Sequence, residues 1–388
     1  MTTKKESPRS TKSVLSMTGR GLAGVSAVVI AIGAAFALAY FALPSFLAVT
    51  YSDSAATTTP ASAASVPPLD TLAYNLKLLE LAHVATSSPW YTAFLEGTTT
   101  ITMSGTTTPT KVVSKLWPAR AAYPQDSRAL LPAHRIVAYY GNFYSTGMGV
   151  LGQYPEGDVI AKLKAAVAEW QAADPSTPVV PAIEYIDVTA QGSAGKDGKY
   201  RARMPDSQID KALEYAKQIN GIVILDIQVG LSTVQDELPL IHDYLAMPDV
   251  HLAIDPEFSM KDGVPPGHEI GTMNSADVNY AINYLSGIVK ANNLPPKILV
   301  VHRFTEDMVT GAKNIVPTPQ VEVVMNMDGW GFPAKKINTY NSVIYPEPVQ
   351  FTGIKLFYKN DLLPPSTGML TPAEVLNLTP APIYVQYQ

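Results

Sequence analysis

Two carboxylates two residues apart are the groups best suited to chemistry in this chain. Asp255 and Glu257 follow the apolar run VHLAI at 250–254. Successive side chains of a strand point to opposite faces, so a strand that continues through both residues would place them on one face, about 6 to 7 Å apart. Repulsion between like charges and exclusion of water can keep one carboxyl protonated near neutral pH. We therefore predict that Glu257 is a general acid and that Asp255 orients it or stabilises developing positive charge. A solvated pair at the rim, or a loop cap, is the alternative.

Ionisable or amide side chains also end most of the other runs that are rich in β-branched residues. The eight runs span residues 136–142, 179–185, 222–228, 250–257, 297–304, 321–328, 351–358 and 382–388. Stretches with helical spacing separate most of them, which is the alternation of parallel strands joined by crossover helices. Eight such units predict an α/β fold, a closed (β/α)8 TIM-type barrel over residues 132–388, with its working groups where the strands end.

Side-chain parity predicts which residues face the interior of this barrel. In each run one face is wholly apolar and should meet the outer helices, so the mixed face should line the barrel. The catalytic candidates are Glu257, Asp255, Asp328 and Asp226. The substrate-binding candidates are Tyr140, Asn142, Glu184, Gln228, His302, Asn326, Trp330, Lys355 and Phe357. Two readings stay open: a purely internal network in which Lys355 neutralises an aspartate, and an inward Tyr185 in place of Glu184. His251 begins its strand and is expected in the bottom layer.

Aromatic residues beside these groups predict a sugar-like ligand. Aromatic faces stack on the apolar surfaces of sugars, while acids and amides bind hydroxyl groups. The segment YYGNFYS at 139–145, Trp330, and Phe357 with Tyr358 could provide such walls. Ordinary packing is the alternative for each of them. The segment 261–275, rich in Gly and Pro, either folds over the mouth of the barrel or connects a strand to the following helix.

Composition excludes several classes of function. The chain has 388 residues and no cysteine, so a disulfide framework, a thiolate zinc site and a cysteine nucleophile are excluded. The formal net charge is -5 and residues 1–20 contribute +4, which leaves -9 for the remainder. An acidic remainder argues against a nucleic-acid partner. No phosphate-cradling glycine loop is present, so we expect no nucleotide cofactor, and no cofactor of any other kind.

The carboxylates and His302 could also be ligands of a hard metal ion. Asp226, Asp255, Glu257 and Asp328 would supply the oxygens. A single well-placed histidine, without His-x-His or His-Glu-x-x-His spacing, does not favour a metal site, and none is predicted. Metal-dependent hydrolysis is kept as the third alternative.

The N-terminal part of the chain predicts a membrane anchor. Residues 21–49 carry no charge and exceed the ~20 residues that cross a bilayer as a helix. We predict a basic cytoplasmic tail at 1–20, a transmembrane helix at 21–50 and a Ser/Thr/Ala/Pro linker at 51–68, with the barrel outside the cell. A cleaved signal peptide is the alternative.

Residues 69–131 are expected to form a small extension that packs on the barrel. Leucines at 69, 72, 76 and 79 have the spacing of an amphipathic helix, and Asp70 is a plausible N-cap. No helix follows the last predicted strand, so we expect the helix near 70–84 to take the place of the eighth outer helix. The Thr-rich segment 97–131 could form a small hairpin.

Six sequence strings resemble an uncharacterised family of bacterial membrane-anchored or secreted barrel proteins. They are AYYGNFYSTGMGVLGQYP, LDIQVGLSTV, HLAIDPEFSM, ILVVHRFT, NMDGWG and GIKLFYKND, and the resemblance covers most of residues 134–388. It implies the barrel fold and brings no activity with it.

A more distant similarity is to chitinase-like glycoside hydrolases. Asp255 and Glu257 match the last two acids of that family's fourth-strand motif, Asp-x-x-Asp-x-Asp-x-Glu, while Val250 and Ala253 replace the earlier aspartates. Asp328 and Met325 match its Met-x-Tyr-Asp motif, but Met327 replaces the tyrosine. The similarity implies glycoside hydrolysis, and these departures fall on the residues that hold the substrate's N-acetyl group in that family.

Together these observations predict a membrane-anchored extracellular carbohydrate-active barrel, a glycoside hydrolase with Glu257 as general acid and Asp328 or Asp226 as second carboxylate. Its expected partner is a carbohydrate or cell-envelope polymer, with membrane contact through the N-terminal helix. The alternative from another class is a noncatalytic glycan-binding scaffold.

Overall fold

The computed structural model describes residues 66–97, 100–101, 110–111 and 121–388. The predicted tail, the predicted transmembrane helix and most of the predicted linker lie outside the described residues. None of the helices within the described ranges is long and apolar enough to cross a bilayer. The described residues belong to one structural unit, Ala64–Gln388.

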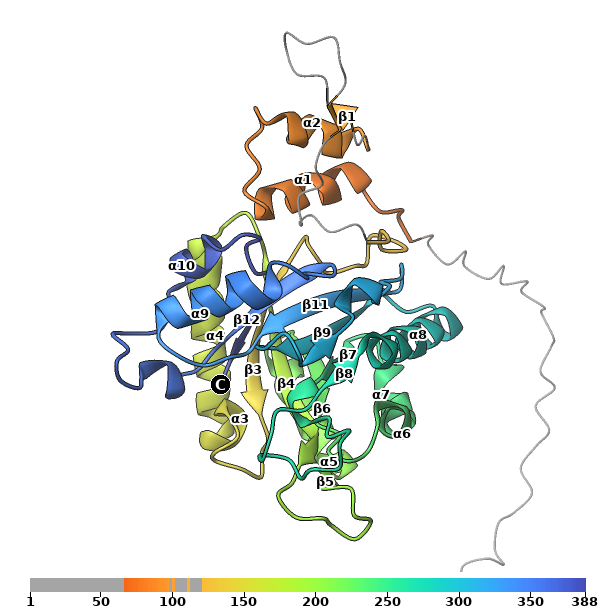
Figure 1. Ribbon diagram of the computed structural model, residues 1–388, viewed down its shortest axis with the longest axis vertical. Helices are drawn as coiled ribbons and strands as arrows, with labels where there is room; N and C mark the ends of the chain where they lie inside the picture. The colour runs from red at the N-terminus through yellow and green to blue at the C-terminus, as the bar shows by residue number, and fades with distance from the viewer. Residues whose placement is uncertain (1–65, 98–99, 102–109, 112–120) are drawn as a thin grey trace, which may run out of the picture. The chain divides into compact units, whose positions relative to one another are not determined.

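Eight parallel strands close into a barrel, which confirms the predicted TIM-type α/β fold (Figure 1). They are β3 (Arg135–Gly141), β4 (Val179–Ala190), β6 (Ile222–Ile227), β7 (Val250–Ile254), β9 (Lys297–Arg303), β11 (Val321–Met327), β12 (Phe351–Leu356) and β13 (Tyr384–Tyr387). Each strand pairs with its neighbour in the order β3-β13-β12-β11-β9-β7-β6-β4, and β3 pairs with β4 to close the ring. Every strand coincides with one of the eight predicted runs.

The connections are unequal in length and in helical content. The helices are α3 (Val150–Gln153), α4 (Glu156–Ala173), α5 (Asp206–Gln218), α6 (Val234–Glu237), α7 (His242–Leu245), α8 (Ser275–Asn292), α9 (Pro333–Thr339) and α10 (Pro372–Leu376). Short helical turns are η1 (Leu238–Ile241), η2 (Pro256–Phe258), η3 (Ala312–Asn314), η4 (Tyr340–Ile344) and η5 (Asn360–Leu362). Between β9 and β11 the chain forms only η3 and the two-residue strand β10 (Val309–Thr310), which pairs with β8 (Met273–Asn274).

Strand β4 departs most from its predicted run. It continues five residues beyond Tyr185, where the run was expected to end, and its pairing with β6 shifts register between Ile186 and Val188. Its end pairs antiparallel with β5 (Arg201–Arg203). A bulge of this kind bends a strand and redirects its side chains, and no sequence pattern marked it.

The two faces of the strands divide the core as parity predicts. The outer faces contribute Leu225, Ile254 and Met325 to one buried apolar cluster with the outer helices α4, α5 and α8. The inner faces contribute Ala138 and Val300, with Ile224, to a second cluster inside the barrel. The polar residues of the inner faces come nearer the strand ends, above this second cluster.

Helix α1 (Thr71–Leu81) packs across the end of the barrel where the strands begin. The expectation that it takes the place of the eighth outer helix is therefore wrong. Its buried Tyr74, Leu78 and Leu79 join the inner cluster, and the Tyr74 ring lies 6.4 Å from that of Phe351, the first residue of β12. Most of the inner-face residues that begin the strands are apolar, and these need a cover that excludes water. The leucine stripe of α1 provides it.

The outer face of the last strand is covered by aromatic side chains instead. Trp170 of α4 donates a hydrogen bond to the Tyr387 hydroxyl at 2.9 Å, and the rings of Tyr358 and Tyr139 pack against Tyr387 at 5.2 and 5.9 Å. These side chains fill the space that a helix after β13 would occupy in a regular barrel.

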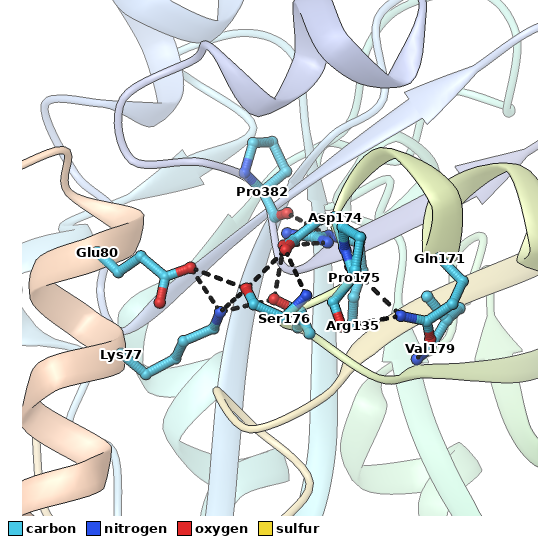
Figure 2. Close-up of polar contacts among 10 residues, drawn as sticks. Lys77, Glu80, Arg135, Gln171, Asp174, Pro175, Ser176, Val179 and Pro382 are labelled. Carbon is cyan, nitrogen blue, oxygen red and sulfur yellow. Dashed lines mark hydrogen bonds and ion pairs between the residues drawn. The ribbon is translucent and has the colours of Figure 1, made fainter.

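Polar contacts fix α1 against the loop between α4 and β4 (Figure 2). Lys77 donates to the hydroxyl of Thr177 at 2.6 Å and pairs with Glu80 at 2.8 Å. Asp174 accepts from the Arg135 guanidinium at 2.9 Å. Burial alone would raise the pKa of Asp174, but its hydrogen bonds to Thr177, Ser176 and Arg135 bring that pKa below its usual range. The helix is therefore held on one side by apolar packing and on the other by a charged network.

The rest of the extension agrees with its expected outline. Helix α2 (Pro89–Leu95) begins at Ser88, whose hydroxyl accepts from Trp90 N. Strands β1 (Thr100–Ile101) and β2 (Thr110–Lys111) pair antiparallel, which confirms the small hairpin.

Removing the buried leucine of α1 should destabilise the barrel, whereas removing an exposed one should not. Leu79 is 0% exposed and Leu72 is 59% exposed on the same helix. We expect Leu79→Ala to lower the free energy of unfolding by about 2 to 5 kcal/mol through lost burial and a cavity. Leu72→Ala should change it by less than about 0.5 kcal/mol. Urea unfolding of the full chain, followed by circular dichroism, measures both, and equal effects would contradict this account of α1.

Candidate functional site

A cavity of about 430 Å³ opens at the carboxyl ends of the barrel strands. Eight of the predicted site residues line it: Tyr140, Gln228, Asp255, Glu257, Asp328, Trp330, Lys355 and Phe357. They come from strands β3, β6, β7, β11 and β12 or from the residues directly after them. Parallel strands of a barrel end on one side, which is why residues so far apart in sequence meet there.

Five predicted residues do not line this cavity. Asn142, Glu184, Asp226, His302 and Asn326 are buried beside or beneath it, each no more than 2% exposed. Asn142 holds a turn, because its Oδ1 accepts from Tyr144 N and its Nδ2 donates to the carbonyl of Ile186, both at 2.9 Å. The other four form a polar layer of the barrel interior. Glu184, and not Tyr185, takes the inward position on β4, since Tyr185 stacks outside on Phe143.

Three carboxylates converge in the cavity. Each of Asp255, Glu257 and Asp328 places one oxygen within 4.8 Å of the others. The expected strand geometry of the first two is wrong, because β7 ends at Ile254 and Glu257 lies on the helical turn η2. Asp255 caps this turn, and its Oδ1 accepts from Glu257 N at 3.1 Å. Proline at the start of the turn cannot continue the strand ladder, which explains the change of direction.

The segment 261–275 supports the turn that carries Glu257 and does not line the cavity. Gly271 N donates to the Glu257 carbonyl at 2.7 Å. A Cβ at Gly271 would lie 2.7 Å from the Pro256 carbonyl oxygen and from Ser259 N, so no other residue fits without a shift of the backbone.

His302 is the centre of the polar layer beneath the cavity. Its Nε2 lies 3.2 Å from Glu184 Oε1, and its Nδ1 lies 3.5 Å from Asp328 Oδ2. Tyr384 and Gln386 of β13 donate to the other oxygen of Glu184. The histidine thus connects a fully buried carboxylate to one that faces the cavity.

A second chain of hydrogen bonds joins Asp226 to Asp255. Tyr140 donates its hydroxyl proton to Asp226 at 2.8 Å, and Gln228 Nε2 lies 3.2 Å from both the Tyr140 hydroxyl and Asp255 Oδ2. Gln228 Oε1 accepts from Ala190 N at the end of the bulged strand β4. The bulge therefore orients the amide that holds Asp255.

Burial and mutual repulsion separate the protonation states of the acids. Burial raises the pKa of Glu257 to about 8, and the charges of Asp255 and Asp328 add to the shift. Burial also raises the pKa of Asp255 to about 6, against the attraction of the His302 charge, and that of Asp226 to about 7. Near pH 7 the site therefore holds a protonated Glu257 beside an ionised Asp255.

Carboxylates hold His302 in its charged form. Burial alone would lower its pKa, but the hydrogen bond to Glu184 and the charges of Asp328 and Asp226 raise that pKa to about 10. His251 shows the opposite case: burial and the charge of Lys297 lower its pKa, and its Nδ1 accepts from Ile298 N at 2.9 Å. His251 lies at the start of its strand as a bottom-layer residue, as expected.

Aromatic side chains form the walls of the cavity. Trp330 is 49% exposed at the rim, and the Lys335 ammonium lies 4.7 Å from its ring centroid. Tyr140 and Phe357 flank the Lys355 ammonium at 3.6 and 5.3 Å. An exposed ring above a set of acids is an arrangement that can stack on a sugar while the acids reach its oxygens.

The three cavity carboxylates could also bind a hard cation through their oxygens. Asp255, Glu257 and Asp328 are the one group of acids and histidines close enough for this among the described residues. The ammonium of Lys355 acts on two of these acids, and a bound cation would have to tolerate that positive charge.

Several residues of the cavity and of the polar layer beneath it were missed by sequence reasoning. Tyr384 and Gln386 alternate with apolar residues along the last strand, so the same parity argument could have found them. Phe304, Lys335 and Asn360 line the cavity from connecting segments, where no periodic signal exists.

No protein-family model and no curated protein matches the chain. Among the solved structures that resemble it at low similarity are a cellulase, an endoglucanase and a mannanase. A protein named Cellulase Cel5C_n has 12% identity and a TM-score of 0.33, over 60% of this chain and 68% of that one. A hyperthermophilic endo-beta-1,4-glucanase in complex with substrate has 9% identity and a TM-score of 0.36, over 66% of this chain and 89% of that one. A ruminal GH26 endo-beta-1,4-mannanase has 9% identity and a TM-score of 0.35, over 66% of this chain and 58% of that one.

All three are named as glycan-cleaving enzymes. TM-scores this low carry no argument about what this chain does. Membership of the uncharacterised bacterial barrel family stays a prediction.

The charged state of His302 can be tested by NMR of its ring nitrogens. We expect its imidazole to stay protonated until about pH 10, because Glu184, Asp328 and Asp226 stabilise the cation. Glu184→Gln keeps the shape of the partner and removes its charge, so it should lower the pKa of His302. Loss of the His302 proton between pH 6 and 7 in the unaltered chain would contradict this assignment.

Proposed function

We propose that this barrel is a glycoside hydrolase. The observation that carries the proposal is that Glu257, whose pKa burial and neighbouring acids raise to about 8, lies within 4.8 Å of a second carboxylate, Asp328, in one cavity. Pairs of carboxyl groups with different protonation states are the catalytic requirement of glycosidic bond cleavage. The exposed Trp330 beside them supports a sugar as the ligand.

The separation of the acids favours retention of configuration. Retaining enzymes place their carboxyl groups about 5 to 5.5 Å apart, whereas inverting enzymes leave about 6.5 to 9.5 Å for a water molecule. One oxygen of Glu257 lies within 4.8 Å of one oxygen of Asp328, which is nearer to the retaining range than to the inverting one. Asp226 does not reach the cavity, so Asp328 is the better candidate for the second carboxylate.

The reaction then has two steps. Glu257 donates its proton to the glycosidic oxygen while an Asp328 oxygen attacks the anomeric carbon, so the bond to the leaving sugar breaks and a glycosyl ester forms. Asp328 lines the cavity, where one of its oxygens can reach a bound sugar. Glu257, now ionised, takes a proton from water as that water attacks the same carbon and releases Asp328.

Two other groups support these steps electrostatically. The His302 imidazolium, 3.5 Å from Asp328 Oδ2, compensates the charge that Asp328 regains when the ester is cleaved. Asp255 stabilises the positive charge that develops on the sugar ring, and Gln228 holds it in place.

The proposal includes an extracellular site of action. The uncharged run at 21–49 after a basic flank supports a single-pass anchor with the barrel outside, where a glycan of the cell envelope would be the substrate.

Glu257→Gln should lower kcat by about 10² to 10⁴, because it removes the proton donor. In the unaltered chain, kcat/KM should rise with pH through about 6 as Asp255 ionises and fall through about 8 as Glu257 loses its proton. Glu257→Gln should lose the alkaline limb. The measurement is release of reducing ends from cell-wall and extracellular polysaccharides by the full-length chain.

Glu269→Gln is the matched control, since Glu269 lies on the segment 261–275 and does not line the cavity. Equal turnover by the Glu257→Gln and unaltered chains would remove Glu257 from the mechanism. Tight glycan binding without turnover would favour a scaffold, and loss of turnover on chelation would favour a metal-dependent hydrolase.

A further inference from the structure

The ammonium of Lys355 is buried at the cavity without a polar partner. The residue is 4% exposed and lines the cavity from the end of β12. Its Nζ forms no hydrogen bond and no ion pair with any residue that the structure describes. Its close neighbours are the rings of Tyr140, 3.6 Å from Nζ to the centroid, and Phe357, at 5.3 Å.

Two other buried lysines show what this chain does with an ammonium that has a structural role. Lys297 donates to the carbonyls of Met247, Pro248 and Val250. Lys336 donates to the carbonyls of Gly329 and Lys355 and pairs with Asp361 at 3.0 Å. Buried cations are expected to be satisfied in this way. Lys355 differs because its donors point at the cavity.

A counterion role alone does not explain this arrangement. The charge of Lys355 lowers the pKa of both Asp255 and Glu257, so the three groups interact. Each of these acids nevertheless lies beyond ion-pair distance of Nζ, and Asp255 already accepts from Gln228 and from Glu257 N. The ammonium lies over the Tyr140 ring and beside the Phe357 ring, and the protons that do not face these rings are left for a group inside the cavity.

A second cation stands at the rim of the same cavity. Lys335 lines it and lies over the exposed Trp330 ring at 4.7 Å. The amide of Asn360 lines the cavity as well. A sugar stacked on Trp330 would therefore lie between the rim ammonium and the buried one.

We infer that Lys355 binds a singly charged acidic substituent of the sugar chain, the carboxylate of a uronic acid, so that the substrate is an acidic glycan. This inference rests on the proposed function for its site. Lys335 is exposed at the rim, so Lys355 is the one buried ammonium among the residues that line the cavity and balances one negative charge there; the second charge of a phosphate monoester would face the three cavity carboxylates. A sulfate ester shares the single charge, and the test separates it from a carboxylate.

The test uses oligosaccharides that differ only at C6. Pairs of gluco-, galacto- and manno-oligosaccharides are compared with their C6-carboxylate and C6-sulfate counterparts, and Kd is measured by calorimetry on the full-length Glu257→Gln chain. We expect the carboxylate form of at least one pair to bind about 10-fold tighter than the neutral form, as for a hydrogen bond to a charged group.

Variants at Lys355 identify the residue responsible. Lys355→Met keeps the apolar stem between the two rings and should reduce the preference for the acidic form to less than about 2-fold, while Lys355→Arg should retain it. Lys290→Met removes an exposed lysine of α8 and should leave the preference intact. Lys355→Gln serves if the methionine variant does not fold, as judged by circular dichroism.

The outcomes separate the substrate class from the proposed function. Absence of binding in every pair, a preference for neutral forms, or a preference that survives both Lys355→Met and Lys355→Gln overturns the inference. A sulfate preferred over the carboxylate, and lost in the same variants, keeps the anion site and replaces its ligand. Turnover of neutral glycans by the active chain without any acidic preference supports the hydrolase and rejects the acidic-glycan site. Lys355-dependent binding without turnover supports the acidic-glycan site and rejects the hydrolase.

Discussion

The structure depends on one cation, the imidazolium of His302, shared by carboxylates in an interior that excludes water. Glu184 and Asp328 lie on opposite sides of the ring, and neither could stay charged there without a positive group between them. Below this layer the barrel is filled with apolar side chains and closed by α1. Above it, Asp255 and Glu257 face a cavity. The charged layer therefore separates the part of the barrel that stabilises the fold from the part that is open to a ligand.

Much of this arrangement could be predicted from the sequence because it follows from strand periodicity. Each of the eight runs became a strand, and alternation placed Tyr140, Glu184 and Lys355 inside the barrel. Part of what escaped prediction depends on contacts distant in sequence, because the position of α1 is set by the apolar ends of several strands. The turn at Glu257 depends instead on a neighbour in sequence, Pro256, which stops the strand. The pattern of an amphipathic helix predicts that its apolar face is buried, but it does not predict against which element.

The roles of the site residues divide according to exposure, which sequence does not reveal. Asp226 and Asp328 both lie near the ends of strands, but Asp226 is inside β6 and sealed under Tyr140, whereas Asp328 follows β11 and reaches the cavity. Lysines divide similarly: Lys336 is saturated with acceptors and Lys355 has none within the described structure. Residues of the same type are therefore best distinguished by whether their polar atoms lack a hydrogen-bond partner after folding.

The contact between Gly271 and the turn of Glu257 gives this side chain a support from outside the cavity. Because a glycine hydrogen lies where any larger group would collide with the Pro256 carbonyl, the outer segment and the turn must shift as one piece. Changes to the length or stiffness of residues 261–270 would consequently adjust the direction of the Glu257 carboxyl while the pocket wall stays chemically unaltered. That segment offers a means of adjusting the site by engineering.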